Sequence, residues 1–428
     1  MKFAHMSDIH LGAFREPILR QIELQVFEEA IQKCIEQKVD FVLICGDIFH
    51  VSIPDLSIVN ETIRTLRLLQ SANIPVYAIY GSHDYTPTGT SIIDILDTAG
   101  ILTNIMKVKK DPEYEKIILD FVIDPKTRAK LAGISARRIG LESKTYENLD
   151  TARLEAEKGF KIFAFHSGIT ELKPSFLSEM ETVPISNFPK GFDYYAGGHI
   201  HIRQEFEQPG YQKIVFPGPL FTGYGKDIED TARGTKRGFY IVEFDEKVSN
   251  VQFVEVKGFD GCYLPFDATG KNSHQARREL TTMLDALDAN GKVVIVRVKG
   301  ELAGGKTTDI NFVELQRQLY SKGAVYVQFN RFGLSSKEFE SNKLAGEDPV
   351  QIESNLFREN IGTVRVSQEN LKGDQGVRSA VELLRVTKDR QKGGESKGDY
   401  QNRIVASGIE TLKLQKEFEK TSAEETGS

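Results

Sequence analysis

The chain has 428 residues, 40% of them hydrophobic and 27% charged, which is ordinary globular usage and suits two or three domains. Its formal net charge of -6 argues against a generally basic, DNA-coating surface, although local basic patches or bound cations can still meet phosphates. The three cysteines have no paired spacing, and there is no signal-peptide core or membrane-length apolar run, so the sequence predicts an intracellular, soluble protein without a disulfide framework.

The first hundred residues alternate between strand and helix. Apolar patterns predict strands at 2–7, 39–45 and 75–80, and helices at 17–38 and 55–72. Such alternation implies largely parallel strands with helices outside the sheet.

A run of strands follows the alternating part. We predict them at 116–124, 161–167, 192–198, 213–218, 238–244 and 251–256. Together the two parts predict a two-sheet α/β sandwich over residues 1–258, with its helices outside. Residues 259–338 are predicted to form a small α+β domain, with helices at 274–287 and 309–320 and strands at 293–298 and 325–329.

The C-terminal part is more polar. We expect a linker at 339–348, a helical segment at 349–420 and a disordered end at 421–428. Asp348-Pro349 resembles a helix start, and narrow apolar stripes favour helices near 377–388 and 400–416. These stripes are too thin for an independent core. A docking arm for a partner is the preferred interpretation, and a loosely packed tail is the alternative.

Histidine and aspartate side chains gather at the ends of five apolar strands. They are Asp8, His10, Asp47, His83, Asp84, His166, His199 and His201. In α/β folds, ligands bind where the carboxyl ends of parallel strands converge. Imidazole and carboxylate together suit Mn, Fe, Zn or Ni better than Ca or Mg. Each motif alone has an ordinary structural interpretation, such as a turn or a core histidine. Their coincidence predicts a dinuclear metal centre, with ions roughly 3.5–4 Å apart.

The ordered motifs SDIHLG, GDIFH, GSHD, FAFHS and GGHIH resemble those of the calcineurin-like metallophosphoesterases. The fuller wording, with RGFYIVEF after the last motif, resembles the SbcD-type DNA double-strand-break repair nucleases, the meiotic-recombination-eleven family. The resemblance covers residues 1–260 strongly. It extends to 260–335 by layout, as that family's DNA-capping domain, and to the tail by position.

This resemblance implies roles for individual residues. One manganese ion is expected on Asp8, His10, Asp47 and His201, and a second on Asp47, Ser82, His166 and His199. His83 is expected beside the scissile phosphate and His50 against DNA. Asp84 is expected to orient a motif histidine rather than bind metal. The family pattern has asparagine where this chain has Ser82, a shorter ligand, so weaker binding of the second ion is expected.

The sequence therefore favours a Mn-dependent DNA exonuclease or endonuclease that acts in double-strand-break repair and homologous recombination. The resemblance implies a coiled-coil ATPase of the SbcC or Rad-fifty type on the C-terminal helices and a homodimer built on helices 55–72 and 91–99, although helices packed on their own sheet would show the same pattern. The expected location is cytoplasmic and nucleoid-associated, or otherwise intracellular. Five arginines near the motif loops could meet DNA phosphates or be ordinary surface residues: Arg15, Arg20, Arg137, Arg138 and Arg203. Two alternatives stay open, a phosphoesterase for small substrates and a DNA-end-binding scaffold weakened at Ser82.

Overall fold

The computed structural model describes residues 1–86, 89–110, 116–136, 142–174, 180–337, 353–354, 357–358, 371–390, 392 and 397–414. The chain divides into two compact units. One consists of Met1–Gly300 with Thr308–Leu334, and the other of Glu301–Thr307 with Ser335–Ser428.

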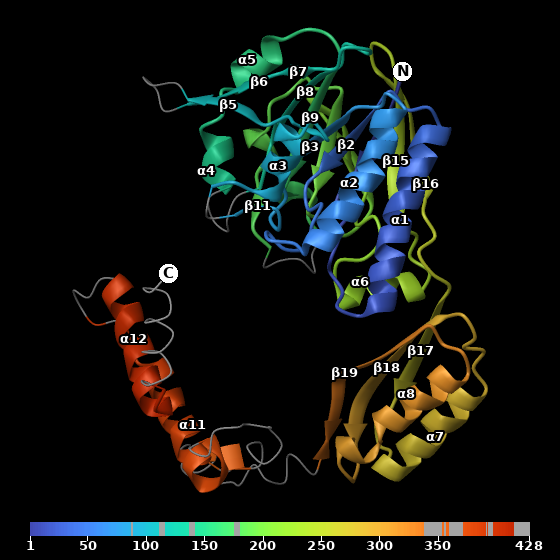
Figure 1. Cartoon of the computed structure of the whole chain (residues 1–428), viewed down its shortest axis with the longest axis vertical. Helices are drawn as coiled ribbons and strands as arrows, with labels where there is room; N and C mark the ends of the chain where they lie inside the picture. The colour runs from blue at the N-terminus through green and yellow to red at the C-terminus, as the bar shows by residue number, and fades with distance from the viewer. Residues whose placement is uncertain are drawn as a thin grey trace. The chain divides into compact units, whose positions relative to one another are not determined.

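A six-stranded sheet of order β16-β15-β1-β2-β3-β4 begins the fold (Figure 1). Its strands are β1 (Lys2–Met6), β2 (Phe41–Cys45), β3 (Val76–Ile79), β4 (Thr103–Asn104), β15 (Gly238–Phe244) and β16 (Val248–Glu255). Strands β1 to β4 are parallel, and β15 and β16 extend the sheet in antiparallel fashion. The carboxyl ends of β1, β2 and β3 therefore share one edge.

A second six-stranded sheet has the order β13-β14-β12-β9-β8-β7. Its strands are β7 (Val122–Ile123), β8 (Lys130–Ile134), β9 (Lys161–His166), β12 (Tyr194–Gly198), β13 (Gln204–Gln208) and β14 (Tyr211–Phe216). The four central strands are parallel, whereas β7 and β13 pair with their neighbours in antiparallel fashion. β9 and β12 thus also end at a common edge.

Apolar side chains fill the space between the sheets. Phe3 and Phe41 of the first sheet join Ile162 and Tyr194 of the second in one buried cluster. Helices α1 (Pro17–Glu36), α2 (Leu56–Ser71) and α3 (Ile92–Thr98) cover the outer face of the first sheet (Figure 1). Helices α4 (Glu142–Glu147) and α5 (Thr151–Ala156) pack outside the second. The predicted two-sheet α/β sandwich with helices outside is confirmed.

Shorter elements connect these layers. They are β5 (Lys107–Lys110), β6 (Ile117–Asp120), β10 (Gly168–Ile169), η1 (Thr170–Leu172), β11 (Thr182–Val183), η3 (Ile185–Asn187) and α6 (Gly225–Ala232). The single strand predicted over 116–124 is wrong in one respect, because it is two strands. β6 pairs with β5, and β7 pairs with β8 of the second sheet.

Most of a three-stranded sheet, β17-β18-β19, also belongs to the first unit, together with two helices, whereas the last residues of β18 and β19 belong to the second. Its elements are β17 (Gly261–Asp267), α7 (Ser273–Asp285), β18 (Val293–Leu302), η4 (Thr307–Asp309), α8 (Phe312–Ser321) and β19 (Tyr326–Ser336). Val293 and Ile295 of β18 are buried in the same apolar cluster as α1. The expected boundaries of this domain, 259–338, stay a prediction.

The C-terminal helices α11 (Gly373–Lys388) and α12 (Lys397–Leu412) contact each other. They cover most of the helices predicted near 377–388 and 400–416 and begin a few residues earlier. The predicted linker at 339–348, the helix start at 349 and the end at 421–428 lie outside the described residues.

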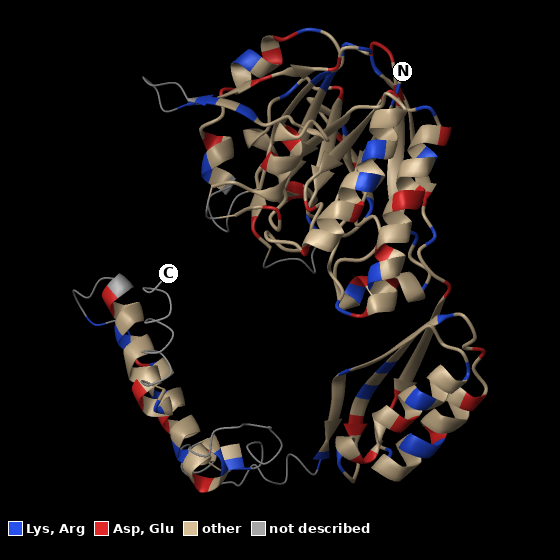
Figure 2. Cartoon of the chain, in the orientation of Figure 1, with Lys and Arg blue, Asp and Glu red and all other residues tan. Residues whose placement is uncertain are grey.

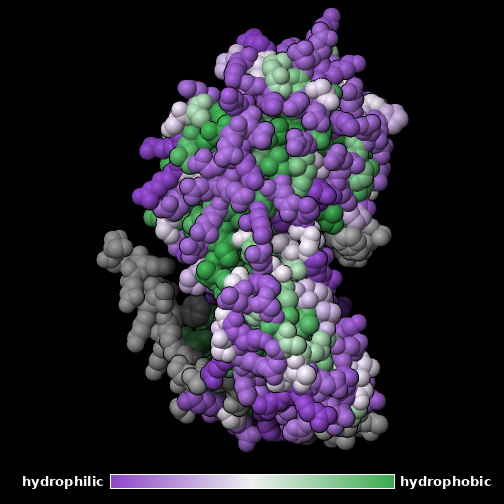
Figure 3. All heavy atoms as spheres, turned by 90° about the vertical axis from the view of Figure 1, so that its right-hand side faces the viewer, coloured by the Kyte–Doolittle hydropathy of each residue, from purple (hydrophilic) through white to green (hydrophobic). Residues whose placement is uncertain are grey.

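The surface is mixed in character. Lys and Arg are interspersed with Asp and Glu over the described elements (Figure 2). The face drawn in Figure 3 is mostly hydrophilic, with hydrophobic patches between. Among the described residues, no helix is both long enough and apolar enough to cross a membrane.

Candidate metal centre

The two sheets bring their motif side chains to one place. Asp8 and His10 follow β1, Asp47 follows β2, His166 ends β9 and His201 follows β12. Among the described residues, three groups of ligand atoms each lie within 4.8 Å of one another. The first is Asp8 with His10 and His201, the second is Asp8 with Asp47 and His166, and the third is His10 with His50 and His83. Asp8 belongs to both of the first two groups. The arrangement therefore offers two adjoining cation sites rather than one.

The backbone at the site adopts a conformation that ordinary residues avoid. Four site residues have positive φ, Asp8 (51°), His10 (53°), Asp47 (52°) and His199 (82°). Such residues cost on the order of 1–3 kcal/mol each and persist only where surrounding contacts fix them. Here, the Asp8 N–H donates to Gly46 O at 3.1 Å and the His10 N–H to Asp47 O at 2.9 Å. These bonds turn the ligands off the strand ends toward the centre.

Two glycines leave room for the site. A Cβ at Gly81 would lie 2.0 Å from Asp47 Oδ1, and one at Gly198 would lie 2.1 Å from Cys45 O. To make room for such a Cβ, the backbone or the buried carboxylate would have to move, at a high cost in free energy. The glycines of the GSHD and GGHIH motifs are thus explained by close approach between the strand ends.

The first group is centred on two histidines. His10 Nε2 and His201 Nε2 lie 3.0 Å apart. His201 Nε2 is 3.8 Å from Asp8 Oδ1, and His10 Nε2 is 3.7 Å from Asp47 Oδ2. Asp8, His10 and His201 thus lie together, and Asp47 lies near His10; that these four residues hold one ion stays a prediction.

Asp227 holds His201 in place, and the motif analysis missed it. Its Oδ2 accepts a hydrogen bond from His201 Nδ1 at 2.9 Å, which leaves Nε2 free for a cation. A carboxylate on the outer nitrogen of a ligating histidine fixes its tautomer and raises its basicity. Burial opposes the charge on Asp227, but the hydrogen bond from His201 prevails and lowers the pKa of this carboxyl. Asp227 lies in α6, a helix that carries no metal-binding motif.

The second group contains an orphaned nitrogen. His166 Nδ1 contacts Cys45 O at 2.8 Å. Its Nε2 lies 3.1 Å from Asp47 Oδ2 and 4.0 Å from Asp8 Oδ1, yet this buried atom has no partner in hydrogen-bond geometry among the described residues. Burial disfavours the charged ring, but Asp47 outweighs it and raises the pKa of His166 to about 10. Two buried carboxylates facing one imidazole nitrogen fit a divalent cation.

His199 and Ser82 complete this region less tightly. The His199 ring lies 5.1 Å from the His166 ring, and its backbone N–H donates to Asp8 Oδ1 at 3.0 Å. Its pKa falls to about 4, mainly through burial. Ser82 is exposed, and its hydroxyl lies 3.4 Å from Asp47 Oδ2. Neither residue belongs to the two groups of closely spaced ligand atoms.

Within the described part of the chain, Asp84 accepts hydrogen bonds from backbone groups and not from a histidine, so the expectation that it orients a histidine is corrected. Its carboxylate accepts from the backbone N–H groups of Gly81 (2.9 Å), Phe49 (3.1 Å) and Ile48 (3.3 Å). Burial and then the Asp47 charge raise the pKa of Asp84 to about 6. Asp84 therefore clamps the loops that follow β2 and β3.

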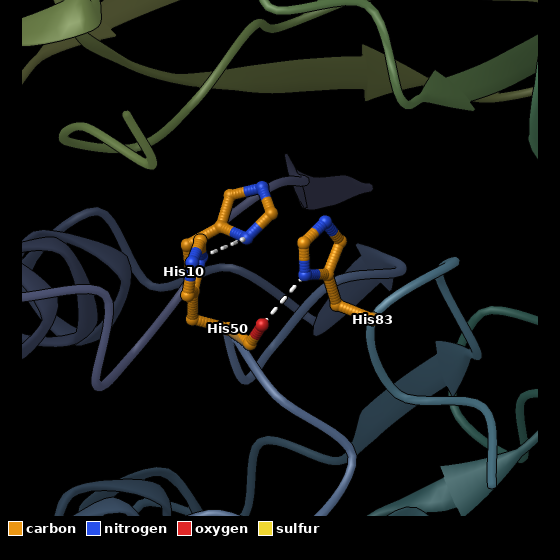
Figure 4. Close-up of side chains that lie close together, drawn as sticks. All are labelled: His10, His50 and His83. Carbon is orange, nitrogen blue, oxygen red and sulfur yellow. Dashed lines mark hydrogen bonds between the residues drawn. The ribbon is translucent and has the colours of Figure 1, made fainter. Parts of the chain in front are cut away.

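His50 and His83 stand beside the first group, around His10 (Figure 4). The Nδ1 atoms of His50 and His10 are 3.4 Å apart, and His83 Nδ1 lies 2.5 Å from His50 O. His83 Nε2 contacts the hydroxyl of Tyr224 at 2.8 Å, a further contact that no motif indicated. His83 borders a cleft of about 340 Å³ that is also lined by His199, His201 and Tyr224.

The arginines predicted to meet DNA phosphates are more scattered than the histidines and aspartates of the metal centre. Arg203 stacks its guanidinium 4.3 Å from the Phe253 ring and lines a hollow beside His201. Arg20 Nη1 lies 3.8 Å from Asp55 Oδ2, and Arg15 is exposed. Arg137 and Arg138 lie outside the described residues. Their contacts with DNA stay a prediction.

Known proteins resemble this chain in amino-acid sequence. The profile of the calcineurin-like phosphoesterase family matches residues 1–203. The DNA double-strand break repair protein Mre11 of Archaeoglobus fulgidus is 27% identical over 270 residues, covering 60% of this chain and 59% of that protein. The protein of the same name from Methanococcus maripaludis is 27% identical over 267 residues, 60% and 67% of the two chains. That from Sulfurisphaera tokodaii is 24% identical over 363 residues, 82% and 86% of the two chains. The matched part thus spans under two thirds of the Archaeoglobus protein.

Proposed function

Because residues 1–203 match the calcineurin-like phosphoesterase family, we propose that this chain is a metal-dependent nuclease that hydrolyses phosphodiester bonds at DNA ends. The observation that carries the proposal is the pair of ligand groups that share Asp8 where the strands of both sheets end. The names of the archaeal relatives support DNA as the substrate.

Two Mn²⁺ ions are the proposed cofactors. One would take Asp8, His10, Asp47 and His201, and the other Asp47, Ser82, His166 and His199. Such ions neutralise a phosphodiester and lower the pKa of a bound water. The mixed nitrogen and oxygen donors fit this choice, since Ca²⁺ and Mg²⁺ prefer oxygen alone.

Four of the chain's own residues would then act beside the ions. Asp227 holds His201 so that Nε2 faces the ion. Asp84 fixes the two loops that carry Asp47 and His83. His83, beside the cleft, would stabilise charge at the scissile phosphate and give a proton to the leaving 3′ oxygen, a contribution typically worth about 10²–10⁴-fold. His50 would contact the DNA.

The proposal also includes binding partners. Helices α11 and α12 would dock on a coiled-coil ATPase of the SbcC or Rad-fifty type. Helices α2 and α3 would form a homodimer face, where Leu56 is 80% exposed and Ile95 is 54% exposed. A role in double-strand-break repair and homologous recombination would place the protein in the cell interior with the DNA.

One observation favours a weaker variant of this function. The Ser82 hydroxyl is exposed and only loosely placed against Asp47. A poorly held second ion would leave a scaffold that binds DNA ends and the ATPase but cleaves slowly.

Cleavage of end-labelled duplex DNA by the isolated chain, with and without Mn²⁺, tests the proposal. We expect Mn²⁺-dependent degradation that a chelator stops and that Asp8→Asn abolishes. Glu314→Gln, on the remote surface of α8, is the control and should cleave normally. DNA binding without cleavage would favour the scaffold. Turnover of a mononucleotide without DNA cleavage would mean a small-substrate phosphoesterase.

A further inference from the structure

Tyr224 reaches the metal centre from a part of the chain that has no metal-binding motif. It immediately precedes α6, and its hydroxyl lies 2.8 Å from His83 Nε2. The ring is 5.3 Å from the His201 ring and 5.7 Å from the His10 ring. Tyr224 is 45% exposed, so it lies at the open side of the cleft that it lines.

The turn that carries Tyr224 is firmly held. Asp227 Oδ2 accepts the backbone N–H groups of Gly223 at 3.0 Å and Tyr224 at 3.1 Å. The same oxygen accepts from His201 Nδ1. A Cβ at Gly223 would lie 2.6 Å from His10 Cδ2, so the turn presses directly on a ligand. The tyrosine is thereby placed by the carboxylate that orients the ligand His201.

The two hydrogen bonds of His83 have a defined direction. Its Nδ1 faces the carbonyl oxygen of His50 at 2.5 Å, and a carbonyl only accepts. In the neutral ring, Nδ1 therefore carries the proton and Nε2 has a lone pair. Tyr224 O–H donates to that lone pair. His50 O sets which nitrogen is protonated, and Tyr224 sets where the ring points.

We propose that Tyr224 is the positioning residue for His83, holding the imidazole so that Nε2 faces the scissile bond at the mouth of the cleft. The inference rests on the nuclease function proposed above. When His83 takes up a proton on Nε2, the tyrosine oxygen becomes the acceptor. As the oxygen of an attacking water bonds to phosphorus and the water gives a proton to solvent, the bond between phosphorus and the 3′ oxygen breaks. Its electron pair stays on the 3′ oxygen, which takes the Nε2 proton. His83 returns to the neutral form.

Two substrates with different leaving groups can show whether Tyr224 positions His83 or only supports the structure. A DNA 3′ alkoxide needs protonation, whereas the nitrophenolate of bis(p-nitrophenyl) phosphate leaves without it. We expect Tyr224→Phe to lower kcat on DNA on the order of tenfold and to leave the aryl ester nearly unchanged. Tyr224→Phe combined with His83→Gln should lose no more than His83→Gln alone, because the two residues act as a unit.

Tyr263→Phe is the matched control. This variant also loses one hydroxyl contact with the α6 region, the 2.6 Å hydrogen bond from Arg233. In the described structure, however, Tyr263 contacts no histidine of the site. It should cleave both substrates like the wild type. Equal losses on both substrates for Tyr224→Phe, or no loss on DNA, would overturn the proposal.

Nitrogen NMR of the metal-free chain with ¹⁵N-labelled histidine provides a readout independent of cleavage. In Tyr224→Phe the Nε2 signal of His83 should move toward that of a nitrogen without a hydrogen bond, and the Tyr263→Phe spectrum should not change. An unmoved His83 signal would contradict the inference. If the wild type cleaves no DNA while this signal moves, the proposed function fails but Tyr224 still positions His83.

Discussion

At the scale of single residues, Ser82 is where this chain departs from the pattern of the nucleases it resembles. Its hydroxyl is short, exposed and 3.4 Å from Asp47 Oδ2. An asparagine side chain reaches farther, and its amide oxygen is a better neutral ligand than a hydroxyl. The number and strength of ligands around the second ion should therefore depend on this position.

We predict that Ser82→Asn binds the second Mn²⁺ about tenfold more tightly, a gain of about 1.4 kcal/mol. Calorimetric titration of the metal-free chain with Mn²⁺ measures both binding steps. Ser82→Ala is the control and should weaken only the second step. Equal affinity in Ser82→Asn and the wild type would mean that position 82 does not contribute a ligand.

Glu23 is a second residue whose environment has a measurable effect. It is 1% exposed in α1, and its carboxylate accepts the backbone N–H groups of Gly12 at 2.7 Å and Ala13 at 3.2 Å. Burial outweighs these bonds and raises the pKa of Glu23 from 4.5 to about 7. Between pH 4.5 and 7 the folded chain keeps a proton that the unfolded chain has released. Stability therefore falls as the pH rises through this window.

The contribution of Glu23 to stability should decline by about 3 kcal/mol between pH 4.5 and 7. Urea unfolding at pH 5 and pH 8 compares the wild type with Glu23→Gln, in which this decline is absent. Glu28→Gln, an exposed change on the same helix, should keep the decline of the wild type. Parallel pH dependence in all three proteins would refute the assignment.

At the scale of elements, α6 joins the β17–β19 sheet to the rest of the first unit. Glu229 of α6 is 3% exposed and accepts from Arg233 at 2.6 Å, Arg297 of β18 at 2.7 Å and Asn330 of β19 at 2.7 Å. The same helix contributes Asp227 to the metal centre. Glu229 is thus the polar anchor between α6 and this sheet.

We predict that Glu229→Gln destabilises the first unit by about 1.5–3 kcal/mol, the usual value for hydrogen bonds to a charged group. Glu314→Gln removes a contact of equal length, 2.6 Å to Arg277, between two well-exposed side chains. It should cost less than about 1 kcal/mol. Hydrogen exchange of the β18 and β19 amides measures both. Similar exchange rates in the two variants would show that the buried hydrogen bonds of Glu229 stabilise the fold no more than the exposed contact of Glu314.

Elements of strong pattern were predictable, and weakly patterned ones were not. α1 has Ile22, Val26 and Ala30 at helical spacing, and β9 has an unbroken apolar run at 162–165, so both were found near their true bounds. β13 reads QEFEQ, a polar edge strand, and β8 reads KLAGI, a short one, and both were missed. Their pairing is decided by neighbouring strands rather than by their own residues.

The same limit applies to the site. The motif residues could be placed together because each follows an apolar strand, and strand ends converge. Asp227 and Tyr224 belong to the segment TGYGKDIED. No pattern within this segment predicts a contact with a histidine that is distant in the sequence. Asp84 was predicted to orient a histidine because it adjoins His83 in the sequence. In the structure its carboxylate instead accepts hydrogen bonds from backbone N–H groups of the neighbouring loops.

At the scale of the whole molecule, cleavage and partner binding are predicted to separate along the chain. The two compact units differ in content, since the metal centre lies in the first and helices α11 and α12 in the second. A protein ending at residue 337 retains every ligand and the complete β19 strand.

We expect the chain 1–337 to cleave DNA at the rate of the full chain and to lose binding to a coiled-coil ATPase of the SbcC or Rad-fifty type. Pull-down of that ATPase and the end-labelled DNA assay, run on the same preparations, check both halves. ATPase capture by the shortened chain would place the docking surface elsewhere.

The bond from the His199 N–H to Asp8 Oδ1, at 3.0 Å, also bears on biosynthesis. Its two residues stand 191 positions apart, and Asp227 comes later still. At about 5–20 residues per second, a ribosome needs roughly ten seconds or more after Asp8 emerges to supply the remaining groups. During that interval the N-terminal ligands have no second sheet to close against. A chain that ends before His199 consequently lacks part of the ligand set and cannot assemble the centre, so under the nuclease function proposed above such short copies would not cleave DNA.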